Sequence, residues 1–203
     1  SVIDEIFEEG SVYHENAQQW VDDRLSELED AFSDIKEFGL EPYYRDLVAS
    51  FGEILSTYIL KEYLRSKGLD SVYIPANKVI ITDDNFNNAY PFYKLTNNRV
   101  RNKIIPAFET EKKDFIFCVT GFIARNKIGH ITTLGRGGSD YTATILAHSL
   151  HEVGNDKDIK VILWKDVDGL LTIDPKYVPD SALIRTIDYA EAAHAVTEAQ
   201  RRA

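Results

Sequence analysis

Apolar residues recur at helical spacing in two long segments at the start of the chain. Within residues 14–38 they follow at alternating four- and three-residue steps, while acidic residues occupy the opposite face. The members of this stripe are Val21, Leu25, Leu28, Phe32 and Ile35. A second apolar stripe runs through residues 43–67, and a glycine follows each segment, at Gly39 and Gly68. Two long helices that each bury one face are therefore expected.

Beyond residue 68, short apolar runs alternate with stretches of helical spacing. Strands are expected at residues 72–75, 79–81, 114–119 and 160–164, and helices at residues 95–108 and 141–150. Near-continuous apolar strands that alternate with helices are typical of a parallel sheet covered on both faces. The predicted fold class is therefore α/β, a three-layer sandwich with a mostly parallel central sheet. The acidic, asparagine-rich stretch 82–89 is expected to form a loop.

Length and composition favour a single domain. A chain of 203 residues with 44% hydrophobic residues can bury one sizeable core. Within residues 1–203 we distinguish a helical portion, 1–68, from an α/β portion, 69–203. No run of about 18 apolar residues occurs, so no membrane-spanning helix is expected. The net charge of −10 argues against nucleic acid or an anionic membrane as a partner, and any anion site must be built locally.

The chain contains one cysteine and no methionine. Cys118 lies in an apolar run, where a thiol has little thiolate character, so we do not expect it to be a nucleophile. A single cysteine cannot form an internal disulfide, which favours a reducing, cytoplasmic location. No signal peptide is recognised. Because the chain starts at Ser1 and lacks methionine throughout, we expect it to be a fragment of a longer protein.

The most informative segment is TTLGRGGSDYTAT, residues 132–144. Its three glycines free backbone N–H groups ahead of a predicted helix, whose dipole favours negative charge. Arg136, placed between glycines, can bind a carboxylate or a phosphate with two hydrogen bonds. The alternative is an ordinary glycine turn capped by Ser139, but it explains neither Arg136 nor Asp140 four residues on. The pattern therefore predicts an anion-binding turn.

The first twelve residues of this segment, TTLGRGGSDYTA, resemble the signature of the aspartate kinases, within the amino-acid-kinase superfamily. Two further blocks are similar to motifs of the same family. Residues 164–175, WKDVDGLLTIDP, resemble its nucleotide-binding loop, and residues 50–56, SFGEILS, resemble its substrate-side helix. The three blocks follow the family's order and cover most of residues 43–193, although the helix block is weak by itself.

The resemblance implies roles for residues on the substrate side. Aspartate binding is implied for Glu53, Gly121, Phe122, Arg136, Gly137, Gly138 and Ser139. Glu53 would recognise the amino group, with a solvated helical glutamate as the alternative. Asp140 would help to organise phosphoryl transfer beside Arg136, and a first-turn helix acid is its compatible structural role. Gly52, unfavourable inside a helix, is expected to allow close approach of a ligand or another backbone.

On the nucleotide side, ATP contacts are implied for Lys165, Asp166, Leu171 and Lys176. Lys176 stands where the family usually has arginine, and Leu171 where some members have tyrosine, so hydrogen-bonding capacity is lost at both positions. The histidines show no metal-ligand spacing, and no protein-bound metal is expected. Mg²⁺ would bridge the phosphates of ATP instead.

The implied reaction is the ATP-dependent phosphorylation of the L-aspartate β-carboxylate, the first step of lysine, threonine and methionine biosynthesis, in a homodimer. The family's Lys-Phe-Gly-Gly-Thr-Ser loop, a second lysine block after residues 191–193 and C-terminal regulatory modules are absent, and residues 194–203 depart from its pattern. We therefore expect at most ligand binding from this chain, with activity belonging to its parent. The alternatives are a noncatalytic or regulatory relative, and a kinase of a related amino acid such as glutamate.

Overall fold

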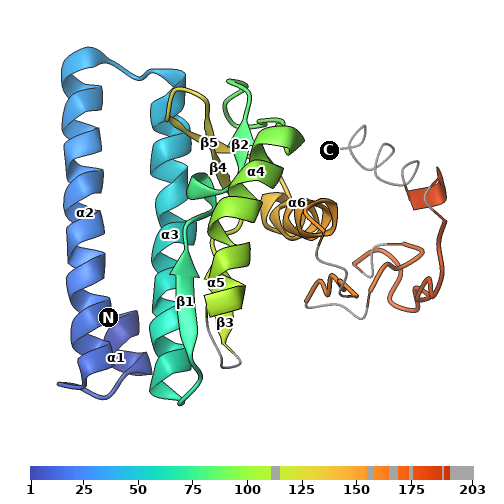
Figure 1. Cartoon of the computed structure of the whole chain (residues 1–203), viewed down its shortest axis with the longest axis horizontal. Helices are drawn as coiled ribbons and strands as arrows, with labels where there is room; N and C mark the ends of the chain where they lie inside the picture. The colour runs from blue at the N-terminus through green and yellow to red at the C-terminus, as the bar shows by residue number, and fades with distance from the viewer. Residues whose placement is uncertain (111–114, 155–157, 165–168, 174–175, 189, 193–203) are drawn as a thin grey trace. The chain divides into compact units, whose positions relative to one another are not determined.

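The computed structural model describes residues 1–110, 115–154, 158–164, 169–173, 176–188 and 190–192. These residues fall into two compact units, 1–161 and 162–203, and each is described by itself. The helices and strands named below all belong to the first unit (Figure 1). No helix in the described ranges is long and apolar enough to cross a membrane.

The first unit opens with three helices, after which groups of short strands and helices follow one another. In chain order they are α1 (Val2–Ile6), α2 (Val12–Phe38), α3 (Pro42–Ser66), β1 (Ser71–Ile74), the 3₁₀ helix η1 (Ala76–Lys78), β2 (Ile81–Thr82), α4 (Tyr93–Lys103), α5 (Ile105–Thr110), β3 (Ile116–Val119), β4 (Ile123–Asn126), β5 (Ile131–Thr133) and α6 (Gly138–Glu152). The two predicted long helices are confirmed as α2 and α3, and the stretch 82–89 forms a loop beyond β2 as expected. The expected burial of the apolar stripe of α2 is wrong for Leu25 and Phe32, which are 42% and 51% exposed.

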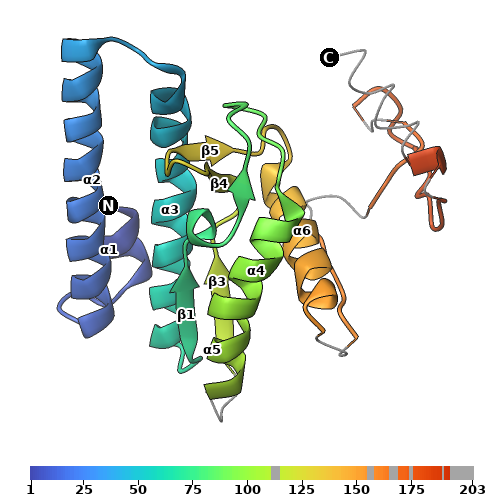
Figure 2. The same ribbon diagram turned by 45° about the horizontal axis from the view of Figure 1, so that its top comes forward.

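The long helices α2 and α3 lie side by side and run in opposite directions (Figure 2). Ser11 caps α2 through its hydroxyl. Gly39 ends the helix with a φ of +95°, and its N–H donates to the carbonyl of Ile35 over 2.9 Å. Between the helices, the ring of Trp20 stacks on that of Tyr58 with centroids 4.1 Å apart. Caps and aromatic packing thus fix the position of α3, which carries part of the candidate site.

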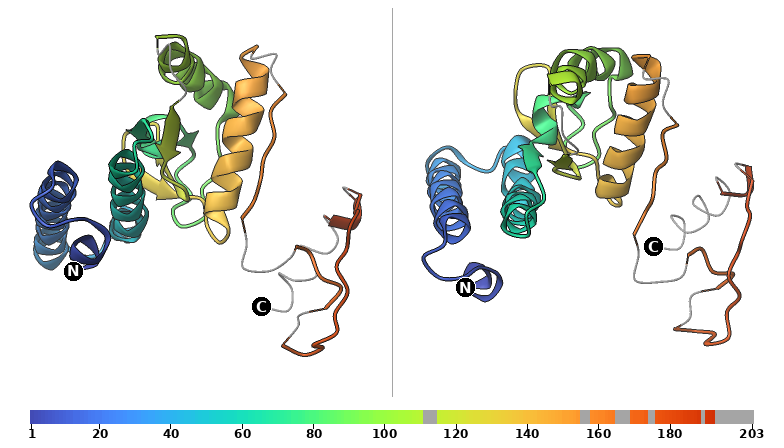
Figure 3. Two further views of the ribbon diagram at one scale, coloured as in Figure 1. Left: turned by 90° about the horizontal axis from the view of Figure 1, so that it is seen from below. Right: turned by 60° about the horizontal axis from the view of Figure 1, so that its bottom comes forward.

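The strands form two small sheets between helical layers. β1 and β3 pair in parallel, with Ser71 opposite Ile116. β2 and β4 are also parallel, and β4 turns back into an antiparallel pair with β5, where Ile123 lies opposite Thr133. Figure 3 shows α3, backed by α2, on one side of the strands and α4, α5 and α6 on the other. The layered α/β fold is confirmed, whereas the antiparallel β4–β5 hairpin was not expected.

Three predicted elements differ from the structure. The helix expected at 95–108 is divided into α4 and α5, because Pro106 has no N–H to continue the ladder of α4. The strand expected at 79–81 is reduced to β2. The strand expected at 160–164 is wrong: the segment pairs with no strand among the described residues, and Trp164 is 90% exposed. An apolar run cannot form a strand without a neighbour to share its backbone hydrogen bonds.

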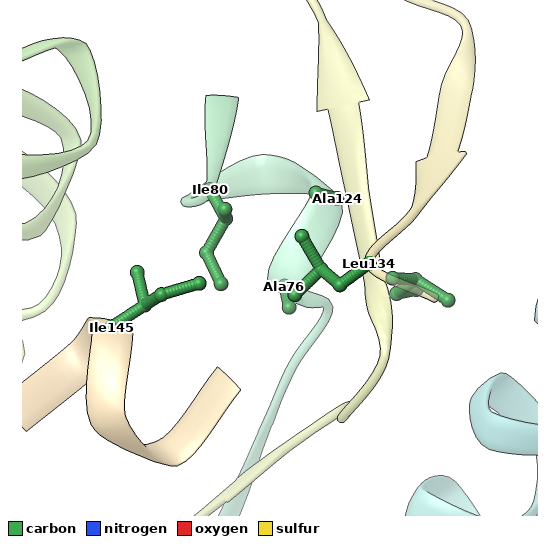
Figure 4. Close-up of a cluster of buried hydrophobic side chains, with 6 residues drawn as sticks. Ala76, Ile80, Ala124, Leu134 and Ile145 are labelled. Atoms are coloured by element: carbon green, nitrogen blue, oxygen red, sulfur yellow. The ribbon is translucent and has the colours of Figure 1, made fainter. Parts of the chain in front are cut away.

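The main core cluster joins η1, β4 and α6 (Figure 4). Its buried members are Ala76, Ile80, Ile123, Ala124, Leu134 and Ile145. Leu134 is buried in this core and directly precedes Gly135, so the glycine-rich turn begins next to a residue that is packed on all sides. This attachment gives the turn a rigid base.

Replacing Ile80 by alanine should lower the free energy of unfolding by about 2–5 kcal/mol, because the residue is fully buried and a cavity would remain. Ile128→Ala is the matched control, since Ile128 is 77% exposed and its loss should change stability by about 0.5 kcal/mol or less. Urea denaturation followed by circular dichroism measures both. Equal losses in the two variants would contradict the placement of this core.

Candidate functional site

The glycine-rich turn connects β5, which ends at Thr133, to α6, which begins at Gly138. Gly135 and Gly137 have φ values of +77° and +73°, in the left-handed region where a side chain is strained. Gly137 is the N-cap of α6, and no side chain caps the helix. The alternative of a turn capped by Ser139 is therefore wrong.

Ser139, the second residue of α6, contacts α3 instead. Its hydroxyl donates a hydrogen bond to Oε1 of Glu53 over 3.3 Å. Glu53 is half-buried in the middle of α3. This one interaction joins the helix block 50–56 to the glycine-rich segment 132–144, as expected if both belong to one site.

Two glycines let the start of α6 pack directly against the segment that precedes β4. A β-carbon at Gly121 would lie 2.6 Å from Oγ of Ser139 and 2.9 Å from its Cα. A β-carbon at Gly138 would lie 3.0 Å from the Cα of Phe122. Both separations are shorter than van der Waals contact, so neither position has room for a side chain. Four of the residues implied in aspartate binding thus form one packed cluster.

Phe122 within this cluster adopts a strained conformation. Its φ is +64°, which costs a residue with a side chain about 1–3 kcal/mol. The surrounding turn is tight, since the N–H of Ile123 donates to the carbonyl of Gly121 over 2.6 Å. The N–H of Phe122 donates to Oγ1 of Thr142 (3.0 Å), and its carbonyl accepts from the N–H of Leu134 (2.9 Å). Both backbone groups of Phe122 are therefore held by the turn and the helix.

The charged residues of the segment lie at the turn and in the first turn of α6. Arg136 is exposed, so its guanidinium is accessible to a ligand. Asp140 is half-buried in the first turn of α6, where the helix dipole favours a carboxylate. The pKa of the next residue, Tyr141, is raised above its usual value by burial and by the hydroxyl of Tyr93, 3.4 Å away. Tyr141 therefore stays neutral beside Asp140.

The nucleotide-side residues are only partly described. Lys165 and Asp166 lie outside the described residues. In the second unit, Leu171 is half-buried and forms an antiparallel bridge with Leu183, while Lys176 is exposed. Within the first unit, by contrast, the structure brings five of the predicted aspartate-side residues into contact, namely Glu53, Gly121, Phe122, Gly138 and Ser139. Arg136 and Gly137 directly precede Gly138 in the chain.

Two other expectations have opposite outcomes. A β-carbon at Gly52 would meet no described atom within 4 Å, so the expected approach of another backbone is not found. Burial raises the pKa of the Cys118 thiol, which agrees with the expectation that this residue is no nucleophile.

Sequence reasoning missed Asp46, which is only 1% exposed. Its Oδ2 accepts hydrogen bonds from the N–H of Asn87 (2.9 Å) and the N–H of Thr133 (2.7 Å). The available signal was its spacing from Glu53. Seven residues are about two helical turns, so both carboxylates lie on the same face of α3.

A groove of about 560 Å³ between α1 and α3 contains none of these residues. It is lined by Val2, Glu5, Ile6, Ser56, Ile59, Leu60, Tyr63 and Lys67. We place the candidate site at the glycine-rich turn instead, because the hydrogen bond from Ser139 to Glu53 joins two of the predicted site segments there. Within the described ranges, no group of three or more His, Cys, Asp or Glu side chains is placed to hold a metal ion.

Residues 8–201 match the sequence model of the amino acid kinase family. The chain is 33% identical over 175 residues to the lysine-sensitive aspartokinase 3 of Escherichia coli, with 86% of this chain and 37% of the relative covered. It is 36% identical over 182 residues to the chloroplastic aspartokinase 1 of Arabidopsis thaliana, with 83% of this chain and 29% of the relative covered.

Solved structures show the same similarity. E. coli aspartokinase III in complex with aspartate and ADP (R-state) superposes with a TM-score of 0.74 at 32% identity, covering 87% of this chain and 38% of that protein. The same enzyme in complex with lysine and aspartate (T-state) gives 0.74 at 30% identity, covering 90% and 38%. The chain therefore spans less than two fifths of the length of these relatives.

Gly121→Ala should lower the free energy of unfolding by about 1–3 kcal/mol, because the new methyl group would overlap the backbone of Ser139. Gly52→Ala is the matched control on α3. No described atom lies near its new methyl group, so it should raise stability by about 0.5–1 kcal/mol. Thermal unfolding distinguishes the two, and stabilisation by both changes would contradict the close packing at Gly121.

Proposed function

Since the chain belongs to the amino acid kinase family, we propose that it is the aspartate-binding part of an aspartate kinase. Such an enzyme transfers the γ-phosphoryl group of ATP to the β-carboxylate of L-aspartate. The observation that carries the proposal is the hydrogen bond from Ser139 to Glu53, which brings the arginine-bearing turn beside a carboxylate. The aspartokinases named above, similar over more than four fifths of this chain, support the same reaction.

The proposed site offers a partner for each charge of L-aspartate. Arg136 binds a carboxylate with two parallel hydrogen bonds. Backbone N–H groups at the start of α6 bind carboxylate oxygens, except that of Gly138, which donates to the carbonyl of Gly135 over 3.0 Å. The Ser139 hydroxyl turns its one proton from Glu53 to a ligand carboxylate once Glu53 has the ammonium group as its partner. Glu53 binds the ammonium group. Because the chain carries a net charge of −10, which repels a diacid at long range, these local contacts must supply the affinity.

The proposed chemistry needs no strong general base. A carboxylate is already a nucleophile at neutral pH, so a β-carboxylate oxygen attacks the γ-phosphorus while the bond to the β–γ bridging oxygen breaks and ADP leaves with that electron pair. Catalysis then consists of positioning and charge stabilisation. Arg136 and Ser139 orient the substrate, and Asp140 organises the transfer site at the start of α6.

The proposed ATP contacts come from the second unit. They are Lys165, Asp166, Leu171 and Lys176. Mg²⁺ would be bound by the phosphates and would neutralise part of their charge.

The proposal extends to the whole protein. Residues 1–203 would form part of its catalytic domain, with 1–68 as the helical portion and 69–203 as the α/β portion. A homodimer in the cytoplasm is proposed as its working state. The free and buried Cys118 fits a reducing compartment.

The test is binding of L-aspartate to the chain by isothermal titration calorimetry. Arg136→Lys should weaken binding about tenfold, because the charge remains but the paired hydrogen bonds are lost, and Arg136→Gln should weaken it about a hundredfold. Arg101→Gln is the matched control, since Arg101 is an exposed residue of α4 and should have no effect on binding.

Selectivity and turnover separate the alternatives. L-Glutamate should bind at least about tenfold more weakly than L-aspartate, because its extra methylene displaces one carboxylate from its partner. Equal binding of both amino acids would favour a kinase of a related substrate. With ATP present, hydroxylamine traps any acyl phosphate, and a parent protein that binds aspartate without forming the hydroxamate would be a noncatalytic relative.

A further inference from the structure

Two carboxylates of α3 bracket the glycine-rich turn. Asp46 accepts a hydrogen bond from the N–H of Thr133, the last residue of β5 before the turn. Glu53 accepts one from the hydroxyl of Ser139, the second residue of α6 after the turn. The two acidic residues are seven positions apart on one rigid helix, about 10.5 Å along its axis. The ends of the turn are therefore both tied to α3.

Asp46 is buried at this position without a cation. It is 1% exposed and forms no ion pair within the described part of the chain. A buried carboxylate is costly unless hydrogen bonds satisfy it, and here two backbone N–H groups do so through a single oxygen. Such charge-assisted bonds are about twice as strong as neutral ones. Asp46 thus holds its two partners firmly.

The second partner of Asp46, the N–H of Asn87, connects α3 to the loop beyond β2 as well. Asn87 donates its N–H to Asp46 and has a φ of +68°. The loop pairs with β5, since the N–H of Ala89 donates to the carbonyl of Thr133 over 2.9 Å. It also lies against the turn, because a β-carbon at Gly135 would be 3.2 Å from the carbonyl oxygen of Asn87. Asp46 therefore connects helix, loop and turn at one point.

We propose that Asp46 is a positioning residue for aspartate binding. It fixes the axial position of α3 against β5, and so places Glu53 and the Arg136 turn at the separation that the ligand requires. This inference rests on the proposed function for the ligand, but the geometric effect can be measured without it.

The experiment compares Asp46→Asn with Glu62→Gln in the full chain. Glu62 is the matched control: it is also fully buried on α3, but its partners are Lys61 and Arg65 on the same helix. Asp46→Asn keeps an acceptor at the same place and removes the charge. It should weaken L-aspartate binding about tenfold with the fold intact. Asp46→Ala should weaken it about a hundredfold, whereas Glu62→Gln should change it less than about twofold.

Amide signals in nitrogen–proton correlation spectra give the independent readout. Asp46→Asn should shift the signals of Thr133, Asn87 and residues 135–139, and Glu62→Gln should leave these in place. If the unmutated chain binds no L-aspartate but Asp46→Asn moves the amide signals of the turn, the proposed function fails. The role of Asp46 in placing the turn against α3 then stands. Unmoved turn signals, or equal losses of affinity in Asp46→Asn and Glu62→Gln, would overturn the positioning role.

Discussion

The candidate site depends on the direct contact of two backbones, which the absence of side chains at Gly121 and Gly138 allows. A methyl group at either position would push α6 away from the segment before β4. The hydroxyl of Ser139 would then lose its place beside Glu53, and the N–H of Phe122 would lose its acceptor on α6, Oγ1 of Thr142. Close packing transmits such shifts because protein interiors contain little free space.

The long helices of this fold are predictable from sequence because their periodicity extends over many turns. Short strands carry much less information. β4 and β5 have four and three residues, and buried threonines such as Thr132 replace the apolar residues that would mark a core strand. Thr132 is satisfied by the hydroxyl of Thr82, 2.6 Å away, on a strand that lies 50 residues earlier in the chain. A hydrogen bond between such distant residues cannot be predicted before the arrangement of the strands is known.

In the candidate site, too, features set by neighbouring residues could be predicted from sequence, whereas contacts between distant residues could not. The glycines of the turn could be predicted to adopt left-handed conformations, since few other residues tolerate them. The link between Ser139 and Glu53 joins residues far apart in sequence, and the resemblance to a known family, rather than spacing, suggested it. Asp46 escaped notice because a lone acidic residue on a helix usually faces solvent. Its burial is a property of the assembled layers.

The two tryptophans of the chain occur one in each compact unit. Trp20 stacks on Tyr58 between α2 and α3, whereas Trp164 is almost fully in water. Indole emission moves to longer wavelength when the ring becomes hydrated, so we expect Trp164 to emit at long wavelength in the folded protein as well. Separation of α2 from α3 would consequently shift the emission of Trp20 alone to longer wavelength. Tryptophan fluorescence therefore reports on the folding of the first unit.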